Sequence, residues 1–144
     1  FFMNYFTSTK SNPVITDFFL LVVRIFIGFA MLSHGFPKLQ QLISGEEIQF
    51  FDFLSLGPKI TLALVVFAEF VCSIFLILGL FTRIAVFFLI VTMAVAGLFV
   101  HGADPFSKRE ASLLYLSVYL LIISLGPGKF SVDQMISKRR ESRW

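Results

Sequence analysis

Four long apolar runs limit what this chain can fold into more than any other feature. A helix needs roughly 20 mostly apolar residues to cross the hydrocarbon of a bilayer. A bare backbone N–H or C=O has no partner in hydrocarbon, so each run must satisfy its own backbone as a helix. The sequence therefore predicts an all-α integral membrane four-helix bundle, forming one membrane domain over residues 1–144. The expected helices cover about residues 18–36, 59–80, 83–101 and 108–125.

Composition excludes a water-soluble protein. Hydrophobic residues make up 57% of the chain and charged residues 15%, whereas a soluble domain carries about 25% charged residues. The chain has 20 phenylalanines, which need lipid to face because a core of this size cannot bury them all. Its basic residues lie at helix ends and in the tail rather than on one soluble face. That placement indicates membrane lipids and excludes nucleic acid as a partner.

The distribution of Lys and Arg predicts the orientation of the bundle, because cytoplasmic flanks of membrane helices carry an excess of them. With both termini in the cytoplasm, the inner side holds Lys10, Arg83, Lys129, Lys138, Arg139, Arg140 and Arg143, and the outer side holds Lys38, Lys59, Lys108 and Arg109. We therefore expect both termini to be cytoplasmic. The first helix should be retained, because no small-residue cleavage site follows it.

The C-terminal tail is expected to be a separate element. It follows a Gly-Pro-Gly sequence at 126–128 that ends the fourth apolar run. Ser131 and Gln134 have the spacing of a capping box, which starts a helix. Residues 131–144 are therefore predicted to form a short basic surface helix or tail on the membrane.

The connection between the first two helices, roughly Lys38 to Pro58, is long for a chain of this kind. It mixes acidic residues with phenylalanines and other apolar residues. Such a segment is either an interfacial or re-entrant element that caps the bundle, which is our prediction, or a docking surface for a partner.

Arg24 and Glu69 are ionisable residues that fall inside predicted spans. Charges in hydrocarbon are costly and mark functional or structural sites. At about 1.5 Å per residue, Arg24 lies about 10 Å from the cytoplasmic start of its helix and Glu69 about 16 Å from the cytoplasmic end of the next. An arginine side chain spans that difference, so we predict an intramembrane polar pair. The pair is either a structural staple or a headgroup-binding or proton-handling site.

A second polar cluster is expected near the outer side of the bundle. It comprises His34, Lys38, His101 and Glu110, which share one depth. These side chains suit a quinone headgroup, a proton in transit or a divalent metal, or they are polar residues that meet interfacial water. They lack the spacing of a zinc motif, so no metal is expected.

The single cysteine, Cys72, limits the redox chemistry that the chain can perform alone. One cysteine builds neither an intrachain disulfide, nor an iron–sulfur cluster, nor a covalent haem site. The topology allows a non-covalent haem ligated by His34 and His101, but no feature of the sequence requires one. Cys72 follows Glu69 by three residues and is expected to be a small buried hydrophobic residue.

Taken in order, these residues resemble the DoxX family. The shared pattern comprises Arg24 with Gly28, HGFPKL from His34 to Leu39, Glu69, LILGLFTR from Leu76 to Arg83, Met93-Ala94, His101, Glu110 and GPGKFSVD from Gly126 to Asp133. The resemblance covers about residues 21–133 and is more specific than any single motif. It implies that the family's characteristic polar residues are Arg24, His34, Lys38, Glu69 and His101.

The resemblance implies a small bacterial inner-membrane protein associated with oxidoreductases. We therefore expect a subunit of a quinone-linked redox system, with a polar intramembrane site that contacts a quinone or lipid headgroup. It should have no built-in cofactor, and its expected partners are other membrane or redox subunits or further copies of itself. If it is an enzyme, it is an oxidoreductase subunit without its own covalent cofactor. The alternative is a non-catalytic membrane scaffold or assembly subunit that docks to a larger complex.

Overall fold

The computed structural model describes residues 2–44, 55–100 and 103–143, and every regular element in these ranges is helical. The α-helices are α1 (Phe2–Phe6), α2 (Pro13–Ile43), α3 (Pro58–Val66), α4 (Ser73–Leu78), α5 (Thr82–Val95), α6 (Phe106–Leu125) and α7 (Val132–Glu141). Two π-helical segments are η1 (Phe67–Cys72) and η2 (Ala96–Val100). The all-α prediction is confirmed for these ranges. The predicted interfacial segment falls largely on residues 45–54, which lie outside the described residues.

Helix α2 is longer than the sequence predicted. It begins at Pro13, where the side chain of Asn12 caps the first turn. It then continues through Pro37 to Ile43 instead of ending before the proline. A proline removes one backbone hydrogen bond, but membrane helices tolerate it because neighbouring groups satisfy the freed carbonyl. Lys38 therefore stays on the helix and inside the bundle.

Among the described residues, three stretches are long and apolar enough to cross a membrane. They are α2, the continuous helix α3–η1–α4 (Pro58–Leu78), and α5 with most of η2 (Thr82–Phe99). The fourth predicted span corresponds to α6, which has 20 residues and carries Lys108, Arg109 and Glu110 near its start. The membrane character of the fold thus rests on three helices, and the fourth crossing stays a prediction.

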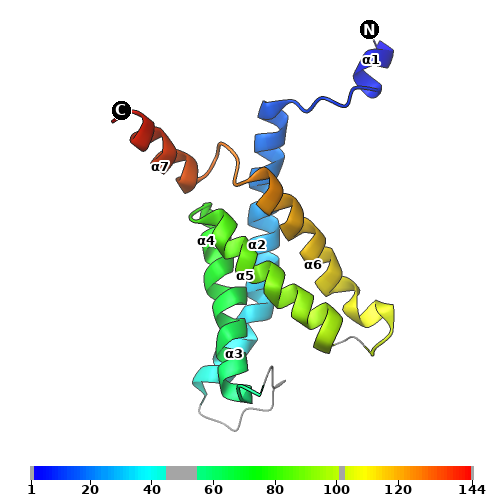
Figure 1. The fold of residues 1–144 in the computed structure, drawn as a ribbon, viewed down its shortest axis with the longest axis vertical. Helices are drawn as coiled ribbons and strands as arrows, with labels where there is room; N and C mark the ends of the chain where they lie inside the picture. The colour runs from blue at the N-terminus through cyan, green and yellow to red at the C-terminus, as the bar shows by residue number, and fades with distance from the viewer. Residues whose placement is uncertain (1, 45–54, 101–102, 144) are drawn as a thin grey trace.

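Helix α2 runs along the length of the bundle, with α3 and α4 alongside it, and α5 and α6 are inclined to α2 (Figure 1). It packs against α3, η1 and α4, while α5 packs against α6 and η1. The buried core where these helices meet includes Met31, Leu76, Val86, Leu89 and Ile122. Both termini lie at the same end of the bundle.

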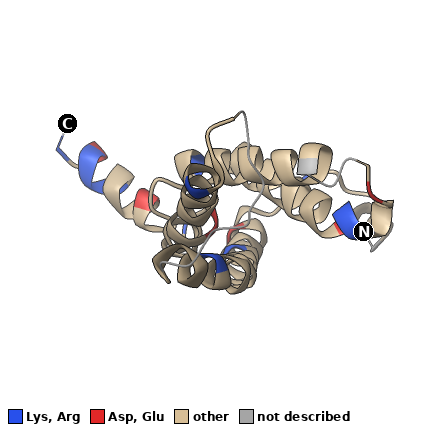
Figure 2. Cartoon of the chain, turned by 90° about the horizontal axis from the view of Figure 1, so that it is seen from below, with Lys and Arg blue, Asp and Glu red and all other residues tan. Residues whose placement is uncertain are grey.

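Many large apolar side chains outside this core face outwards. Phe26 is 72% exposed and Phe99 is 68% exposed, and every long helix presents further exposed phenylalanines. Figure 2 shows Lys and Arg as isolated patches on the bundle and as a cluster on α7. Such an apolar surface is solvated by lipid rather than by water.

Candidate functional site

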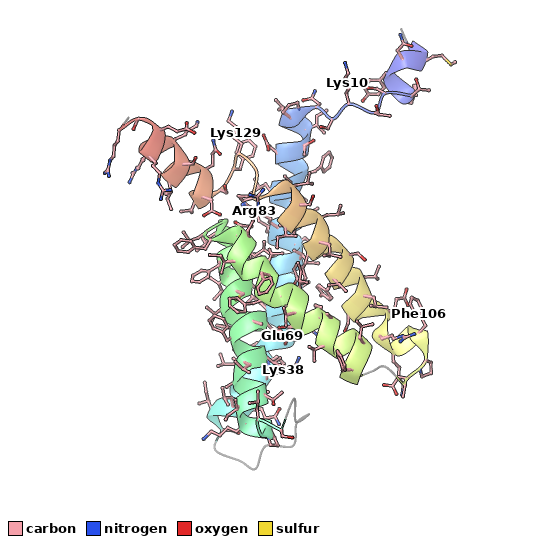
Figure 3. The ribbon with its side chains drawn as sticks, viewed as in Figure 1. Lys10, Lys38, Glu69, Arg83, Phe106 and Lys129 are labelled. Carbon is pink, nitrogen blue, oxygen red and sulfur yellow. The ribbon has the colours of Figure 1, made fainter. Side chains whose placement is uncertain are left out.

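An ion pair joins α2 to the π-helical segment η1. The Lys38 ammonium donates to both carboxylate oxygens of Glu69, at 2.8 Å to Oε1 and 2.7 Å to Oε2, and Figure 3 shows the two residues beside each other. The side chain of Glu69 is 4% exposed and that of Lys38 is 31% exposed. Within the described ranges it is the only ion pair. A carboxylate so deep in an apolar bundle needs a counter-charge to stay ionised.

The local backbone brings the two residues together. Glu69 lies on η1, and π-helical turns inside α-helices often occur at functional sites. Gly35 packs directly on this turn, because a Cβ added there would lie 3.0–3.1 Å from the carbonyl carbon, the oxygen and the Cβ of Glu69. Small residues allow such close approach between membrane helices. Lys38 is three residues after Gly35, so it shares the face of α2 that meets Glu69.

Two tyrosines of α6 complete the surroundings of the pair. Tyr115 and Tyr119 lie within electrostatic range of Glu69, and their rings stack with centroids 6.1 Å apart. His34 meets Tyr115 edge-on at 5.8 Å. Tyr119 is fully buried, and its hydroxyl has no hydrogen-bond partner in the described part of the chain. The residues His34, Lys38, Glu69, Tyr115 and Tyr119 are called the Lys38–Glu69 site below.

The chemistry of this site suits a small polar headgroup more than a metal. It offers an ammonium and a phenol as donors and a carboxylate as acceptor, in otherwise apolar surroundings, which is typical of ligand sites. Among the described residues, no group of three His, Cys, Asp or Glu side chains is placed to hold a metal ion. Cys72 is buried in the hydrophobic core, as a small apolar side chain would be.

The predicted pair of Arg24 with Glu69 is not formed, because each residue has another partner. Glu69 pairs with Lys38, and Nη2 of Arg24 donates to the backbone oxygen of Phe130 at 2.7 Å. With the first helix predicted to end before Pro37, Lys38 was expected in the outer polar cluster with His34 and not as the partner of Glu69. From the end that α2 shares with α3, Lys38 lies about 8 Å deep, Glu69 about 16 Å and Arg24 about 28 Å, at about 1.5 Å per residue. Lys38 is the nearer cation.

Arg24 instead holds the segment that joins α6 to α7. It is 1% exposed, and its Nη1 packs so closely on Gly79 that a Cβ there would overlap it. The backbone N–H of Asp133 donates to the Gly79 oxygen at 2.9 Å. The Asp133 carboxylate accepts from the N–H groups of Phe81 and Thr82, at 2.8 and 2.9 Å, and so caps the start of α5. The residues Arg24, Gly79, Phe130 and Asp133 are called the Arg24 junction below.

The predicted outer cluster is only partly assembled. His34 and Lys38 belong to the Lys38–Glu69 site, whereas Glu110 is exposed on α6 and forms no ion pair in the described ranges. His101 lies outside the described residues. The two tyrosines of α6 were not predicted as site residues, although their spacing of four residues places both on one helix face.

Comparison with known proteins connects this geometry to a family. The DoxX family model matches residues 19–102. A protein of Haemophilus influenzae is 33% identical over 132 residues, which cover 85% of this chain and 93% of the relative. A second protein of that organism is 26% identical over 126 residues, covering 83% of each chain. Both relatives are described only as uncharacterized proteins, and no solved structure matches the chain.

The family match includes the charged residues of α2 and η1 that form polar contacts between helices. Residues 19–102 contain Arg24, Lys38 and Glu69, together with the second and third apolar helices and most of the first. The match covers more than half of the sequence, and the first relative extends along most of it. The chain therefore belongs to the DoxX family of membrane proteins.

Proposed function

We propose that this protein binds a quinone headgroup at the Lys38–Glu69 site, as a subunit of a membrane redox system. The observation that carries the proposal is the Lys38–Glu69 ion pair, whose carboxylate is 4% exposed, together with the Tyr119 hydroxyl within electrostatic range of Glu69; this hydroxyl is fully buried and has no hydrogen-bond partner among the described residues. A purely structural ion pair does not explain a buried hydroxyl without a hydrogen-bond partner, whereas a polar ligand would supply that partner.

The two redox forms of a quinone match the donors and acceptors of the site. A quinone ring presents two carbonyl oxygens, and the quinol presents two hydroxyls. Lys38 has three N–H donors and uses two on Glu69, so one remains for a quinone oxygen. The Tyr119 hydroxyl is the donor for the other oxygen, and Glu69 is the acceptor for a quinol hydroxyl. The face of a tyrosine ring suits stacking with a flat headgroup.

The protein works with other subunits under this proposal. Electron transfer to or from a bound quinone requires a flavin, haem or metal centre, which a partner would supply. This chain would bind and orient the quinone and provide Glu69 as the group that exchanges a proton with it.

The proposal includes a fourth membrane crossing by α6 and a bacterial inner-membrane location with cytoplasmic termini. At about 1.5 Å per residue, the 20 residues of α6 extend about 30 Å, close to the hydrocarbon thickness. The common position of the two termini (Figure 1) supports an even number of crossings. The basic end of α7, with Lys138, Arg139 and Arg140, supports the cytoplasmic side.

Quinone extraction tests the proposal. The full chain is purified in mild detergent, and bound quinone is extracted and quantified for the native protein and for the variants Lys38→Met and Tyr119→Phe. We expect about one quinone per protein, a loss of at least about tenfold in Lys38→Met, since a hydrogen bond from a charged group contributes roughly 1.5–3 kcal/mol, and a loss of about threefold to tenfold in Tyr119→Phe, since a bond between neutral groups contributes roughly 0.5–1.5 kcal/mol. Matched controls are Lys59→Met and Tyr5→Phe, which remove the same groups at exposed positions outside the site and should retain quinone.

The result that contradicts the proposal is a native protein without quinone, or equal quinone in the site variants and the controls. If such a preparation also retains a stoichiometric partner protein, the second candidate function applies. That candidate is a non-catalytic membrane scaffold or assembly subunit. It is favoured by the Arg24 junction, where a buried charge holds a chain segment through the Phe130 carbonyl.

A further inference from the structure

A cavity of about 660 Å³ opens at the end of the bundle where both termini lie. Its wall comes from the start of α2, the start of α5, the end of α6, the following loop and the start of α7. Figure 3 shows Arg83 and Lys129 at this end, where α6 leads into α7. The cavity shares no residue with the Lys38–Glu69 site, so it is a separate candidate for binding.

The charges that line this cavity are unequally available to a ligand. Its two carboxylates are already engaged by backbone amides: Asp133 accepts from the start of α5, and Asp17 accepts from the Lys129 N–H at 3.3 Å. The two cations, Arg83 and Lys129, form no ion pair in the described ranges. The formal charges of the lining balance, but Arg83 and Lys129 are the groups whose charged donors have no ion-pair partner in the described ranges, and these donors suit an anionic group.

The Arg83 guanidinium is held against the wall of the cavity. A Cβ added at Gly126 would lie 3.2 Å from Nη2 of Arg83, so a side chain at this position would crowd the guanidinium. Gly126 has a φ of +84°, a conformation that favours glycine. The turn at the end of α6 thus holds the backbone of Gly126 close to the Arg83 guanidinium.

The same cavity has an apolar flank that faces outwards. Phe81 is 57% exposed, Ile84 is 61% exposed and Leu125 is 56% exposed, and all three line it. A free phosphate or other small anion gains nothing from these side chains. A molecule with an anionic headgroup and hydrocarbon tails uses both the cations and this flank.

We infer that this cavity binds the headgroup phosphate of an anionic phospholipid. Arg83 and Lys129 bind the phosphate, and the acyl chains lie along Phe81, Ile84 and Leu125. The inference does not depend on the quinone proposal, because the two sites use different residues at different depths. A bound lipid here would fasten the start of α5 to the loop between α6 and α7.

Native mass spectrometry of the full chain in detergent tests the inference. The probes are phosphatidylglycerol, phosphatidylcholine of the same acyl chains, and inorganic phosphate in large excess as competitor. Each basic group near an anionic membrane surface contributes about fivefold in affinity, so Lys129→Gln should weaken phosphatidylglycerol binding about fivefold and the pair with Arg83→Gln about 30-fold. Phosphatidylcholine should bind less tightly than phosphatidylglycerol to the native protein.

The matched control is the double variant Lys138→Gln with Arg139→Gln, which removes two cations from α7 outside the cavity and should keep the preference for phosphatidylglycerol. The Lys129 side chain is exposed, so the single Lys129→Gln variant provides the test if the double variant does not fold. The inference is overturned if the control loses as much affinity as the cavity variants. It is also overturned if inorganic phosphate displaces the lipid, or if the two lipids bind equally.

Discussion

The Lys38–Glu69 site and the Arg24 junction hold buried charges in different ways. In the first, an ammonium donates to both oxygens of a carboxylate between α2 and η1. In the second, a guanidinium that is 1% exposed donates to a backbone oxygen, and Nε and Nη1 have no hydrogen-bond partner among the described residues. The first arrangement is a pair that depends on both members. The second fastens a loop to the bundle, and the nearby Asp133 carboxylate acts on its charge through space without an ion-pair contact.

Because the two regions hold their charges differently, substitutions in them should affect the stability of the bundle differently. Removing one member of a buried pair leaves the other charge uncompensated. Removing an arginine that has no contacting acid also removes a desolvated charge, which offsets the lost hydrogen bond. Substitutions in the two regions should therefore differ in cost, even though each region has one buried or half-buried cation.

The largest effect is expected for Lys38→Met. The change leaves the Glu69 carboxylate, 4% exposed, without its counter-charge. We expect a loss of about 3 kcal/mol, at the low end of the cost of breaking a buried pair because the lysine side chain is partly exposed. Unfolding by sodium dodecyl sulfate in mixed micelles measures it, with Lys59→Met as the control.

Adding Glu69→Gln to Lys38→Met sharpens this result. A neutral amide no longer needs a counter-charge, so the double variant should regain most of the lost stability. If Lys38→Met alone unfolds like the native protein, the ion pair does not carry the stability that its burial implies.

The next largest effect is expected for Gly35→Ala. The added Cβ would lie 3.0–3.1 Å from atoms of Glu69 that include its backbone, so the two helices must move apart. Overpacking of this kind costs about 2 kcal/mol. Gly97→Ala is the matched control, since its nearest contact is the end of the Leu113 side chain at 3.3 Å, which can turn aside. The same micelle unfolding assay should show Gly35→Ala as clearly the less stable variant, and equal stabilities would contradict close packing at the site.

Sequence reasoning predicted the helices better than the contacts between them. Apolar runs and the Gly-Pro-Gly turn locate the second, third and fourth long helices to within about two residues, whereas the first begins five residues earlier and ends seven residues later than predicted. The Ser131 side chain accepts from the Gln134 N–H at 3.2 Å, as the capping pattern indicated. Local patterns of this kind are encoded in neighbouring residues, and so they are visible in one sequence.

The partner of Glu69 was not predictable in this way. The choice between Arg24 and Lys38 depended on whether the helix continues through Pro37, and tertiary contacts decide that. The π-helical turn at Glu69 cannot be read from the sequence either, because the helix from Pro58 to Leu78 is apolar throughout, so the change of helix face that an added residue causes does not show in the apolar pattern. His34, Lys38 and Glu69 were therefore identified from the sequence, whereas the pairing of Lys38 with Glu69 and the two tyrosines of α6 required the structure.

A smaller loss is expected when the cap of α5 is removed. Asp133→Ala deletes the carboxylate that accepts from the Phe81 and Thr82 N–H groups. Loss of an N-terminal capping side chain costs about 1–2 kcal/mol. Hydrogen exchange at these two amides should accelerate, whereas Glu141→Ala on exposed α7 should leave them unchanged. Unchanged exchange in Asp133→Ala would mean that the cap does not form in solution.

The smallest effect on stability is expected for Arg24→Met, and it tests the comparison most directly. The substitution loses the hydrogen bond to the Phe130 oxygen, which is worth roughly 1.5–3 kcal/mol for a charged donor. It also removes two buried nitrogens without partners among the described residues, which offsets about as much. The net loss should be about 1 kcal/mol or less, well below that of Lys38→Met.

The same variant should nevertheless loosen the loop that Arg24 holds. Amide exchange in residues 129–133 should accelerate in Arg24→Met while exchange around η1 stays as in the native protein, because the two regions share no hydrogen bond. A stability loss as large as that of Lys38→Met would contradict this distinction. It would show that Asp133, whose charge acts on Arg24 through space, depends on the guanidinium as an ion-pair partner does, and the Arg24 junction would then be a second ion-pair site instead of a fastening for the loop.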